Sequence, residues 1–590
     1  MARLVLLLAC AREAAAFEPS LPRSAGARGR ALASALASAP SRTTGMDYLS
    51  PEARERAMNP KANPIEKMKI VKDGTSAFTD VYEYAAAIRA GTLTWEDVEK
   101  QDFDNRLKWV GLLHRSKRTP GKFMMRLRTP NGVVTSSQLR FYAESVEPYG
   151  PELGVVDITT RQSIQLRGVE LQDADKIIDG LAARNQTSFQ SALDNIRNLV
   201  GSPLAGIDAL ELVDTRPFCE NLNDMASLNR ETGQRGNPQW GNLPRKFNIA
   251  VSGGRDDYAH THINDIGLQP VKHAKTGVVG FNVVLGGYFS IKRSVDAVHM
   301  DLWMPADVGA VDRFCEAILE IFRDEGARGN RQEARLRCLV DKLGVDVFRA
   351  KVVAKLPAGE QAQIDVEQAQ DAAPWARREL LGVHAQVQPG LSRVGVHVPS
   401  GRLSVQQCRD LADLADKYSG GECRVTVDQN AIFANVKDAD VAALLAEKAL
   451  NQGYLAVNPG NIVGHSVTCT GAQFCGLGLI ETKGHADVMT RALQAKFDVP
   501  TPLRIHWTGC PNSCAQVQVA DIGIMGAPAR KVDAEGKAKA VPGCNIFVGG
   551  TIGEDSQLSL EPWRSGVPLE DLQPIMEELI VEKFGATPKK

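Results

Sequence analysis

Four cysteines in the last quarter of the sequence form two pairs whose spacing suits metal chemistry. Cys469 and Cys475 form a C-x5-C pair, and Cys510 and Cys514 form a C-x3-C pair. Pro511 suits the first position of a helix, so Cys510 and Cys514 are predicted one helical turn apart on the same side. A helix amino terminus also favours anionic thiolates. Four such thiols in a large chain indicate a metal site more than a disulfide framework.

Two kinds of metal site agree with this arrangement. An iron–sulfur cubane needs four thiolates that converge from tight loops, and two such pairs supply them. Zinc also accepts four thiolates, although its sites more often show C-x2-C or C-x4-C spacing. Unrelated cysteines are the third interpretation, and spacing alone leaves all three open. Outside the amino-terminal leader, the other cysteines follow no motif and are expected to be small buried side chains: Cys219, Cys315, Cys338, Cys408, Cys423 and Cys544.

A basic segment without any acidic residue lies between Asn105 and Ala143. By the two-residue period of a strand, Arg126 shares one face with Lys122, while the opposite face is apolar. The segment is either a solvated basic face, or a site for an anion or an acidic partner. Its cations include Arg106, Lys108, Arg115, Lys117, Arg118, Lys122, Arg126 and Arg128.

The elements that must position these residues are repeated along the chain. Residues 122–169 and 392–436 both show a strand, a Pro-x-Gly turn, a helix and a strand, with Gln162 and Gln429 at matching places. A second echo is found in 280–287 and 545–550. Self-similarity at this distance predicts an internal duplication and a pseudo-twofold α+β fold.

The two copies differ where charge matters. Gly395 stands in the second copy where the first has Arg126, and Asp428 stands where the first has Arg161. One copy has therefore kept cations that the other has lost.

Both cysteine motifs resemble those of the nitrite and sulfite reductase family. They read Thr468-Cys-Thr-Gly-Ala-Gln-Phe-Cys475 and His506-Trp-Thr-Gly-Cys-Pro-Asn-Ser-Cys514. The resemblance runs from about residue 60 to 585, and other stretches match in the family's order: Arg106–Trp109, Met124–Arg126, Thr160–Gln162, Asp194–Arg197, Asn242–Asn248 and Phe289–Arg293. Several long motifs in order are more specific than one short pattern, so the resemblance favours the iron–sulfur interpretation.

The resemblance implies a siroheme that is joined to a [4Fe-4S] cluster. It assigns Cys514 as the bridge to the siroheme iron, with Cys469, Cys475 and Cys510 completing the cluster. Siroheme carries many carboxylates, so its burial requires cationic donors. The further cofactor-binding residues that the resemblance implies are Arg161, Gln162, Lys292, Arg293 and Asn512. The distal pocket, where the anion meets the iron, is assigned to Arg126, Arg197, Lys246 and Asn248.

Asn248 is the residue that bears on the substrate. The sulfite branch of the family carries a second lysine at this place, and a neutral amide lowers the positive charge of the pocket, which suits a monoanion better than a dianion. Residues 475–483 also resemble the nitrite branch. The expected reaction is the six-electron reduction of nitrite to ammonium, within nitrate assimilation. Ferredoxin-dependent sulfite reduction is the alternative, followed by a non-enzymatic siroheme-binding or sensing role and a zinc-stabilised structural protein.

The electron donor is expected to be another protein. No Gly-rich dinucleotide fingerprint opens a βαβ unit, and no extra length is present for flavin or nicotinamide domains. The resemblance points to reduced ferredoxin, an acidic protein that a local basic surface would attract. The candidate cations are Lys108, Arg115, Lys117 and Arg118, which the sequence does not distinguish from residues that face siroheme.

The amino terminus is typical of a bipartite targeting leader. A short apolar core follows Arg3, Phe17 lies at the junction, and residues 21–46 are rich in Arg, Ala and Ser without an acidic residue. A signal peptide followed by a transit peptide predicts the stroma of a complex plastid. A plain secretory signal with a pro-segment is the alternative.

Composition limits the remaining possibilities. The 69 basic and 70 acidic residues argue against binding of nucleic acid through bulk charge. Downstream of the leader, no apolar run approaches the ~18 residues of a membrane helix, and a monomer without membrane contact is expected.

The resemblance also sets the expected fold and its division. The fold is α+β, internally duplicated and pseudo-twofold, with ferredoxin-like α/β sandwich units and two mixed α/β cofactor-binding domains. The expected segments are a leader (1–46), an arm (47–117), a ferredoxin-like half (118–188), a first 4Fe-4S-type domain (189–355), a linker (356–388), a second half (389–455) and a cysteine-bearing domain (456–590).

Overall fold

A computed structural model describes residues 44–589, apart from 370–374, 453, 533–535 and 554–555. Nearly all of the predicted leader (1–46) lies outside these residues. Among the described helices, none is both long enough and apolar enough to cross a membrane.

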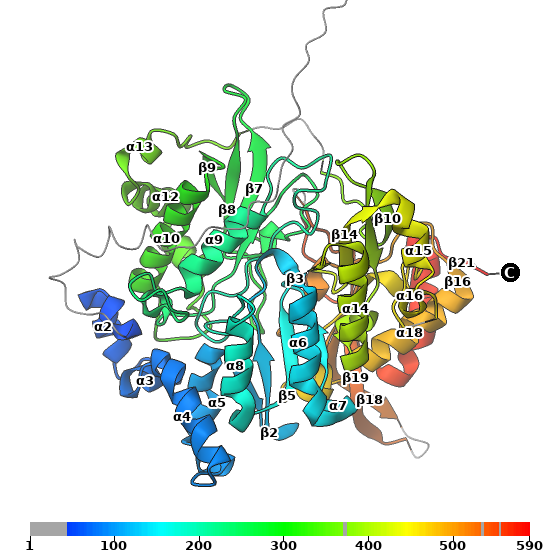
Figure 1. The fold of residues 1–590 in the computed structure, drawn as a ribbon, viewed down its shortest axis with the longest axis horizontal. Coiled ribbons are helices and arrows are strands. Elements are labelled where there is room, and N and C mark those ends of the chain that lie inside the picture. The colour runs from blue at the N-terminus through cyan, green and yellow to red at the C-terminus, as the bar shows by residue number, and fades with distance from the viewer. Residues whose placement is uncertain (1–43, 370–374, 453, 533–535, 554–555, 590) are drawn as a thin grey trace, which may run out of the picture. The chain divides into compact units, whose positions relative to one another are not determined.

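The arm is a series of short helices that pack on the first ferredoxin-like half and on the mixed domain that follows it (Figure 1). Ser50 and Asn63 cap the first two of them, and a proline follows each cap at the first helical position. Trp109, at the end of the arm, is fully buried and donates a hydrogen bond to the Gly241 carbonyl over 2.8 Å. The α-helices of the arm are α2 (Pro51–Met58), α3 (Pro64–Val71), α4 (Ala77–Arg89) and α5 (Lys100–Asp104).

The two repeats form two five-stranded sheets, and each sheet includes one short strand from the other repeat. The first sheet has the order β1 (Leu112–Arg115), β2 (Thr119–Arg126), β5 (Ile164–Glu170), β4 (Val156–Ile158) and β12 (Arg402–Leu403). The second has the order β10 (Gly382–Ala385), β11 (Leu391–Val396), β14 (Ala431–Lys437), β13 (Glu422–Val425) and β3 (Val133–Thr135). This reciprocal exchange confirms the pseudo-twofold α+β prediction and joins the halves in one hydrophobic core.

Helices α6 (Ser136–Val146) and α14 (Val405–Tyr418) lie side by side across the pseudo-twofold relation (Figure 1). Thr135 caps α6 through a capping box with Gln138, and Ser404 caps α14 in the same way. The two helices present their apolar sides to the shared core, so the repeat is preserved at the level of helix capping and packing.

The last strand predicted for each repeat is a hairpin of two strands. Gln162 and Gln429 have φ angles of 52° and 64°, and each donates its backbone N–H to a threonine carbonyl three residues earlier. This left-handed residue reverses the chain, and a hydrophobic pattern does not reveal such a turn. Residues 159–163 therefore leave the sheet as a loop at the edge of the cavity described below.

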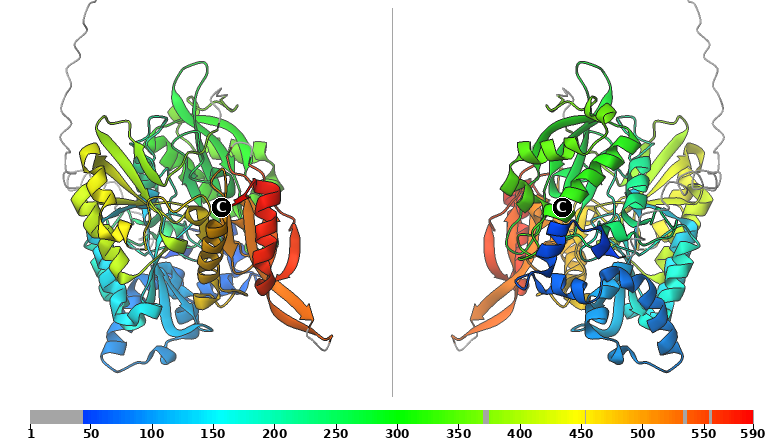
Figure 2. Two further views of the ribbon diagram at one scale, coloured as in Figure 1. Left: turned by 90° about the vertical axis from the view of Figure 1, so that its right-hand side faces the viewer. Right: turned by 90° about the vertical axis from the view of Figure 1, so that its left-hand side faces the viewer.

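Two mixed domains follow the two ferredoxin-like halves. The first has a sheet of β6 (Ile249–Val251), β7 (Ile266–Lys272), β8 (Val279–Leu285) and β9 (Val298–Pro305), packed against α9 (Arg216–Ser227), α10 (Val308–Glu325), α11 (Leu336–Leu343) and α12 (Val345–Ala354). The second has β15 (Ser466–Thr468), β17 (Ile505–Thr508), β18 (Ile522–Val532), β19 (Ala538–Val548) and β20 (Arg564–Pro568), packed against α18 (Lys483–Lys496) and α19 (Leu572–Phe584). Strands β18 and β19 form a long hairpin that projects from this domain (Figure 2).

The similar segments 280–287 and 545–550 occupy equivalent places in the two sheets. Gly286 and Gly287 donate backbone hydrogen bonds to the loop that enters β7, and Gly549 and Gly550 do the same to the loop that enters β18. The duplication therefore covers the mixed domains as well as the ferredoxin-like halves.

Candidate cofactor and anion site

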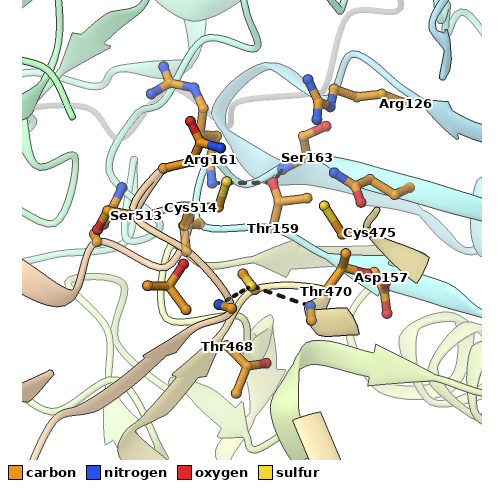
Figure 3. A pocket seen from close by; sticks show the side chains of 18 of the residues that line it. Arg126, Asp157, Thr159, Arg161, Ser163, Thr468, Thr470, Cys475, Ser513 and Cys514 are labelled. Carbon is orange, nitrogen blue, oxygen red and sulfur yellow. Dashed lines mark hydrogen bonds between the residues drawn. The ribbon is translucent and has the colours of Figure 1, made fainter. Parts of the chain in front are cut away.

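One cavity brings together the four clustered cysteines and most of the predicted cations. In Figure 3, Cys475 and Cys514 face the same space, with Arg126 and Arg161 along its other side. The cysteines come from the second mixed domain, whereas these two arginines come from the first ferredoxin-like half. The cavity is therefore built from opposite halves of the duplication.

The first cysteine pair begins where β15 ends. The Cys469 sulfur accepts hydrogen bonds from the backbone N–H groups of Gly471 (3.3 Å) and Gly509 (3.1 Å). A single helical turn, α17 (Gly471–Phe474), then leads to Cys475. The two backbone donors fix the position of the Cys469 sulfur at the cavity, as suits a metal ligand.

The second pair follows β17, but the helix predicted at Pro511 is absent. Residues 511–516 form successive turns, and Ser513 (φ 50°) and Gln516 (φ 60°) have left-handed backbones that an α-helix does not allow. Cys510 is buried and accepts a side-chain contact from Asn512 at 3.5 Å, whereas Cys514 is exposed to the cavity. The turns direct both sulfurs toward the cavity without a helix.

The arrangement of the thiols bears on the metal that they hold. Across the residues that the structure describes, no three His, Cys, Asp or Glu side chains gather as ligands of a single ion. A cubane takes its ligands at its corners and therefore needs them farther apart. Four thiols on one cavity wall are the donor set of such a cluster.

Of the other cysteines, all that were predicted to be buried are so except Cys338, which is half-buried.

The predicted distal residues all line the cavity: Arg126, Arg197, Lys246 and Asn248. The Arg197 side chain is held by the Leu193 carbonyl at 2.9 Å, and that of Arg126 lies 3.5 Å from the Ser191 carbonyl. Asn248 donates its backbone N–H to Asp265 over 2.9 Å. These contacts use backbone groups and leave the charges of the two arginines uncompensated by a carboxylate among the described residues.

Burial and mutual repulsion act on this group of cations. Burial, and then the charge of Arg115, lowers the pKa of Arg126 to about 10. Burial, and then Arg335 and Arg197, lowers the pKa of Lys246 well below its ordinary value. Such shifts show that the chain has gathered like charges in a poorly solvated place. An anionic ligand would relieve that cost.

Arg161 and Asn512 also line the cavity, as predicted for cofactor-binding residues. The Arg161 guanidinium donates to the Asn264 side chain at 2.8 Å and to the Asn198 carbonyl at 3.2 Å. Among the described residues, its buried Nε finds no acceptor, and neither does that of Arg197. Buried donors without partners fit a ligand with several carboxylates, which is what siroheme supplies.

Three other residues that the resemblance implied for the cofactor lie elsewhere. Gln162 is buried behind the cavity wall, where its Oε1 accepts a hydrogen bond from the Gly201 N–H at 2.9 Å, so it shapes the 159–163 loop. Lys292 and Arg293 are exposed on the loop after Phe289, and Arg293 pairs with Asp341 at 2.8 Å. Of this loop, the structure brings Phe289 to the cavity and not the two cations.

Sequence reasoning missed Arg335, which lines the cavity beside the predicted cations. Its Nε and Nη2 donate to Asp265, while its buried Nη1 has no partner in the part of the chain that the structure describes. Asp265 is also the acceptor for the Asn248 backbone, so one carboxylate fixes both residues. No motif signal surrounds Arg335, which is separated from Asn248 by most of the first mixed domain.

A second group that sequence reasoning missed is centred on Asp157. The Asp157 carboxylate contacts Arg167 at 2.9 Å, Arg402 at 2.7 Å and Lys483 at 3.8 Å. Burial favours the neutral carboxyl, but the three cations outweigh it and hold the pKa of Asp157 well below its ordinary value. Arg167 also donates to the Thr470 hydroxyl at 2.6 Å. The group thus ties both ferredoxin-like halves to the cysteine loop.

The arm contacts the segments that carry two of the predicted distal cations. Lys69 is 1% exposed, forms an ion pair with Glu66, and donates to the Leu243 carbonyl at 3.1 Å. It also lies 3.7 Å from Asp194, which pairs with Arg331. Leu243 and Asp194 each lie three residues before a distal cation, so the arm sets the position of both segments.

The chain was compared with known proteins. The family described as "Nitrite and sulphite reductase 4Fe-4S domain" matches residues 192–360 and 460–582, and the "Nitrite/Sulfite reductase ferredoxin-like half domain" matches 115–184 and 384–449. The chain is 46% identical to "Ferredoxin--nitrite reductase, chloroplastic" of Zea mays, over 90% of each chain. It is 44% identical to "Ferredoxin--nitrite reductase" of Synechococcus elongatus, over 90% of this chain and 99% of that one.

A solved structure shows the same fold. The NirA protein of Mycobacterium tuberculosis superposes with a TM-score of 0.75 at 26% identity, covering 88% of this chain and 93% of that one. The repeated ferredoxin-like half domain and the 4Fe-4S domain match in the order that the sequence motifs predicted. The chain belongs to the nitrite and sulfite reductase family.

Proposed function

We propose that this enzyme reduces nitrite to ammonium with six electrons from reduced ferredoxin, as a step of nitrate assimilation. One observation carries the proposal: four cysteines and a set of cations without carboxylate partners line the same cavity. The relatives named ferredoxin–nitrite reductase, which align with about nine-tenths of the chain, support this substrate and this donor.

The residues of the cavity fit the siroheme and the [4Fe-4S] cluster of the family. Cys469, Cys475, Cys510 and Cys514 would hold the cluster, with Cys514 as the bridge. The unpartnered guanidinium nitrogens of Arg161, Arg197 and Arg335 are suited to siroheme carboxylates. When bound, the two cofactors store electrons and pass them to the substrate.

The chain's own contribution is to bind and orient the anion. Arg126, Arg197 and Lys246 would hold the nitrite oxygens through charge-assisted hydrogen bonds. The same groups stabilise negative charge as each N–O bond breaks and its oxygen leaves as water. The two arginines contact backbone carbonyls before substrate arrives, so little reorganisation of them is needed. Asn248 keeps one neutral donor in the pocket, which favours nitrite over a dianion.

Several wider assignments belong to the same proposal. We propose the seven-segment division given above, with the arm, Gln162 and the Asp157 group as positioning elements. Lys292 and Arg293 stay predictions that depend on a movement of their loop. We also propose a monomer without membrane contact in the stroma of a plastid. Relatives from Zea mays and Spinacia oleracea, which are named chloroplastic, support the plastid, and the complex plastid rests on the leader composition alone.

The test is anaerobic turnover of the holoenzyme with reduced ferredoxin, with nitrite and sulfite compared and the visible spectrum recorded. Ammonium from nitrite, formed much faster than sulfide from sulfite and with siroheme absorption present, is the expected result. Faster sulfite reduction would overturn the substrate assignment. A colourless, inactive protein from a host that supplies siroheme would overturn the cofactor assignment.

A further inference from the structure

The rim of the cavity beside the cluster ligands exposes two large apolar side chains. Leu477 is 61% exposed and Leu479 is 51% exposed, and both belong to the loop that follows Cys475. The residues between and after them, Gly478 and Ile480, are buried. The loop therefore presents its leucines outward while it is anchored beneath.

The loop is anchored at both ends: the Leu479 N–H donates to the Gly509 carbonyl at 2.8 Å, and the helical turn α17 before the loop is held by the second ferredoxin-like half. Arg402 donates to the Gln473 side chain at 2.6 Å and stacks on the Phe474 ring at 5.0 Å. Phe474 is itself buried and is contacted by Arg167 on the same ring at 5.1 Å. A surface that is fixed before a partner arrives loses little entropy on binding.

A cationic turn adjoins the leucines. Residues 115–119 join β1 to β2, and Lys117 and Arg118 are exposed there. The Lys117 side chain packs against Gly476, where an added Cβ would lie 3.4 Å from the Lys117 Cβ. In the described part of the chain, Arg115, Lys117 and Arg118 have no carboxylate partner. Two exposed positive charges thus stand next to the residue that follows a cluster ligand.

We propose that Lys117, Arg118, Leu477 and Leu479 form the surface on which reduced ferredoxin docks; this rests on the proposed function. The occupant is an acidic one-electron carrier, because an apolar centre with a positive rim complements an apolar patch with a negative one. Electron transfer requires the donor to approach the cluster closely. Cys475, half-buried and two residues before Leu477, is the ligand nearest in sequence to this surface.

The experiment compares two electron donors in the holoenzyme. In the double variant Lys117→Glu/Arg118→Glu, the KM for reduced ferredoxin is expected to rise about tenfold, and its dependence on salt to flatten. Nitrite reduction driven by reduced methyl viologen, a small donor that needs no docking surface, is expected to stay within about twofold of wild type. Leu479→Ser is expected to raise the KM about threefold without a change in the salt dependence.

A matched control reverses two other exposed cations, in Lys67→Glu/Lys342→Glu on α3 and α11. This variant has the same net charge as the test variant and is expected to keep the wild-type KM for ferredoxin. An unchanged KM in the Lys117/Arg118 variant, equal losses with both donors, or an equal rise in the control would each refute the surface. Wild-type enzyme that forms no ammonium with methyl viologen would instead refute the proposed function.

Discussion

The cavity has a counterpart in the other half of the duplication, and the two differ in almost every chemical group. The backbone is the same in both: Asp257 and His260 have left-handed φ angles in the first mixed domain, as Ser513 and Gln516 have in the second. In this register Tyr258 stands where the second domain has Cys514. The first mixed domain therefore repeats these backbone turns, with Tyr258 at the place of the ligand Cys514.

In the counterpart other residues replace Arg161 and Arg126, and the chain itself fills the space. Asp428 replaces Arg161, and it pairs with Arg377 at 2.7 and 3.0 Å. Gly395 replaces Arg126, and a Cβ added there would lie 1.8 Å from the Leu380 carbonyl. Arg377 and Leu380 belong to residues 375–381, part of the segment predicted as a linker.

The two halves of the duplication contribute different chemical groups to one site. One half supplies thiols and the other supplies cations, and the real site is where these two contributions meet. At the related place, residues 375–381 satisfy the polar groups from within the chain. For example, Arg378 pairs with Asp208 and Asp256, and Tyr258 donates to the Arg378 carbonyl. A repeated backbone thus identifies two candidate sites, and only the side chains show which of them is open.

The largest difference between the two halves is expected at Cys514, the position assigned as the bridge. Cys514→Ser is expected to abolish the coupled centre and nitrite reduction, because a hydroxyl does not replace the shared thiolate. Tyr258→Phe, the matched change in the counterpart, is expected to keep both. Cofactor content, visible absorption and turnover measure the effect. Full activity with unchanged siroheme absorption in Cys514→Ser would contradict the bridging role.

The next largest effect is expected at the position where the first copy has Arg161 and the second has Asp428. Arg161→Ala is expected to lower siroheme retention by about tenfold, through the loss of charge-assisted hydrogen bonds to carboxylates. Asp428→Ala leaves Arg377 unpaired and is expected to cost about 2 kcal/mol of unfolding free energy, since both side chains retain some exposure. Siroheme content and denaturant unfolding separate the two outcomes. Equal siroheme loss in both variants would remove the distinction between the sites.

The substrate preference offers a narrower test. Asn248→Lys adds a cation to the distal pocket and is expected to shift the ratio of kcat/KM for nitrite and sulfite about tenfold toward sulfite. Asn248→Gln keeps a neutral amide and is the control for a change of size. Competition assays with methyl viologen as donor measure the ratio, and an unchanged ratio in the lysine variant would argue against the role of charge.

The smallest expected effect concerns the Asp157 group, which exists only on the cysteine side. Arg424 occupies the place of Asp157 in the second sheet and donates to the Ala205 carbonyl at 2.7 Å. Lys483→Met removes one positive charge beside the Cys469 loop and is expected to disfavour cluster reduction about fivefold, near 40 mV given about 59 mV per tenfold. Redox titration followed by EPR measures this shift, and Lys483→Arg is expected to retain the wild-type potential.

Much of this arrangement could be predicted from the sequence. The repeats, their capped helices and the cysteine pairs are local patterns, and Gln162 and Gln429 were matched correctly, although the turn that each of them makes was predicted as part of a strand. Strand exchange escaped prediction, because β3 and β12 are only three and two residues long and carry no pattern of their own. The helix expected at Pro511 was wrong because Ser513 has a left-handed backbone, which no propensity for serine indicates.

The site residues, too, could be predicted only where a local motif contains them. Two motif residues line the cavity, Arg126 from the end of β2 and Arg197 from a loop of the first mixed domain. Arg335 reaches the same cavity from a segment without a motif, and only tertiary packing brings it there. Residues 375–381 resembled a linker in composition, although their ion pairs hold them firmly in the fold.

The uncompensated cations of the cavity have a consequence for the fate of newly made chains. Without its anionic cofactors, the protein retains several buried positive charges that repel one another, and this repulsion is released only on loading. Ligand binding to the folded state alone raises its stability by mass action. A chain that fails to acquire siroheme is therefore expected to open more often and to be degraded sooner. Turnover by the proteases of its compartment would then match the amount of enzyme to the supply of its cofactor, without a dedicated sensor.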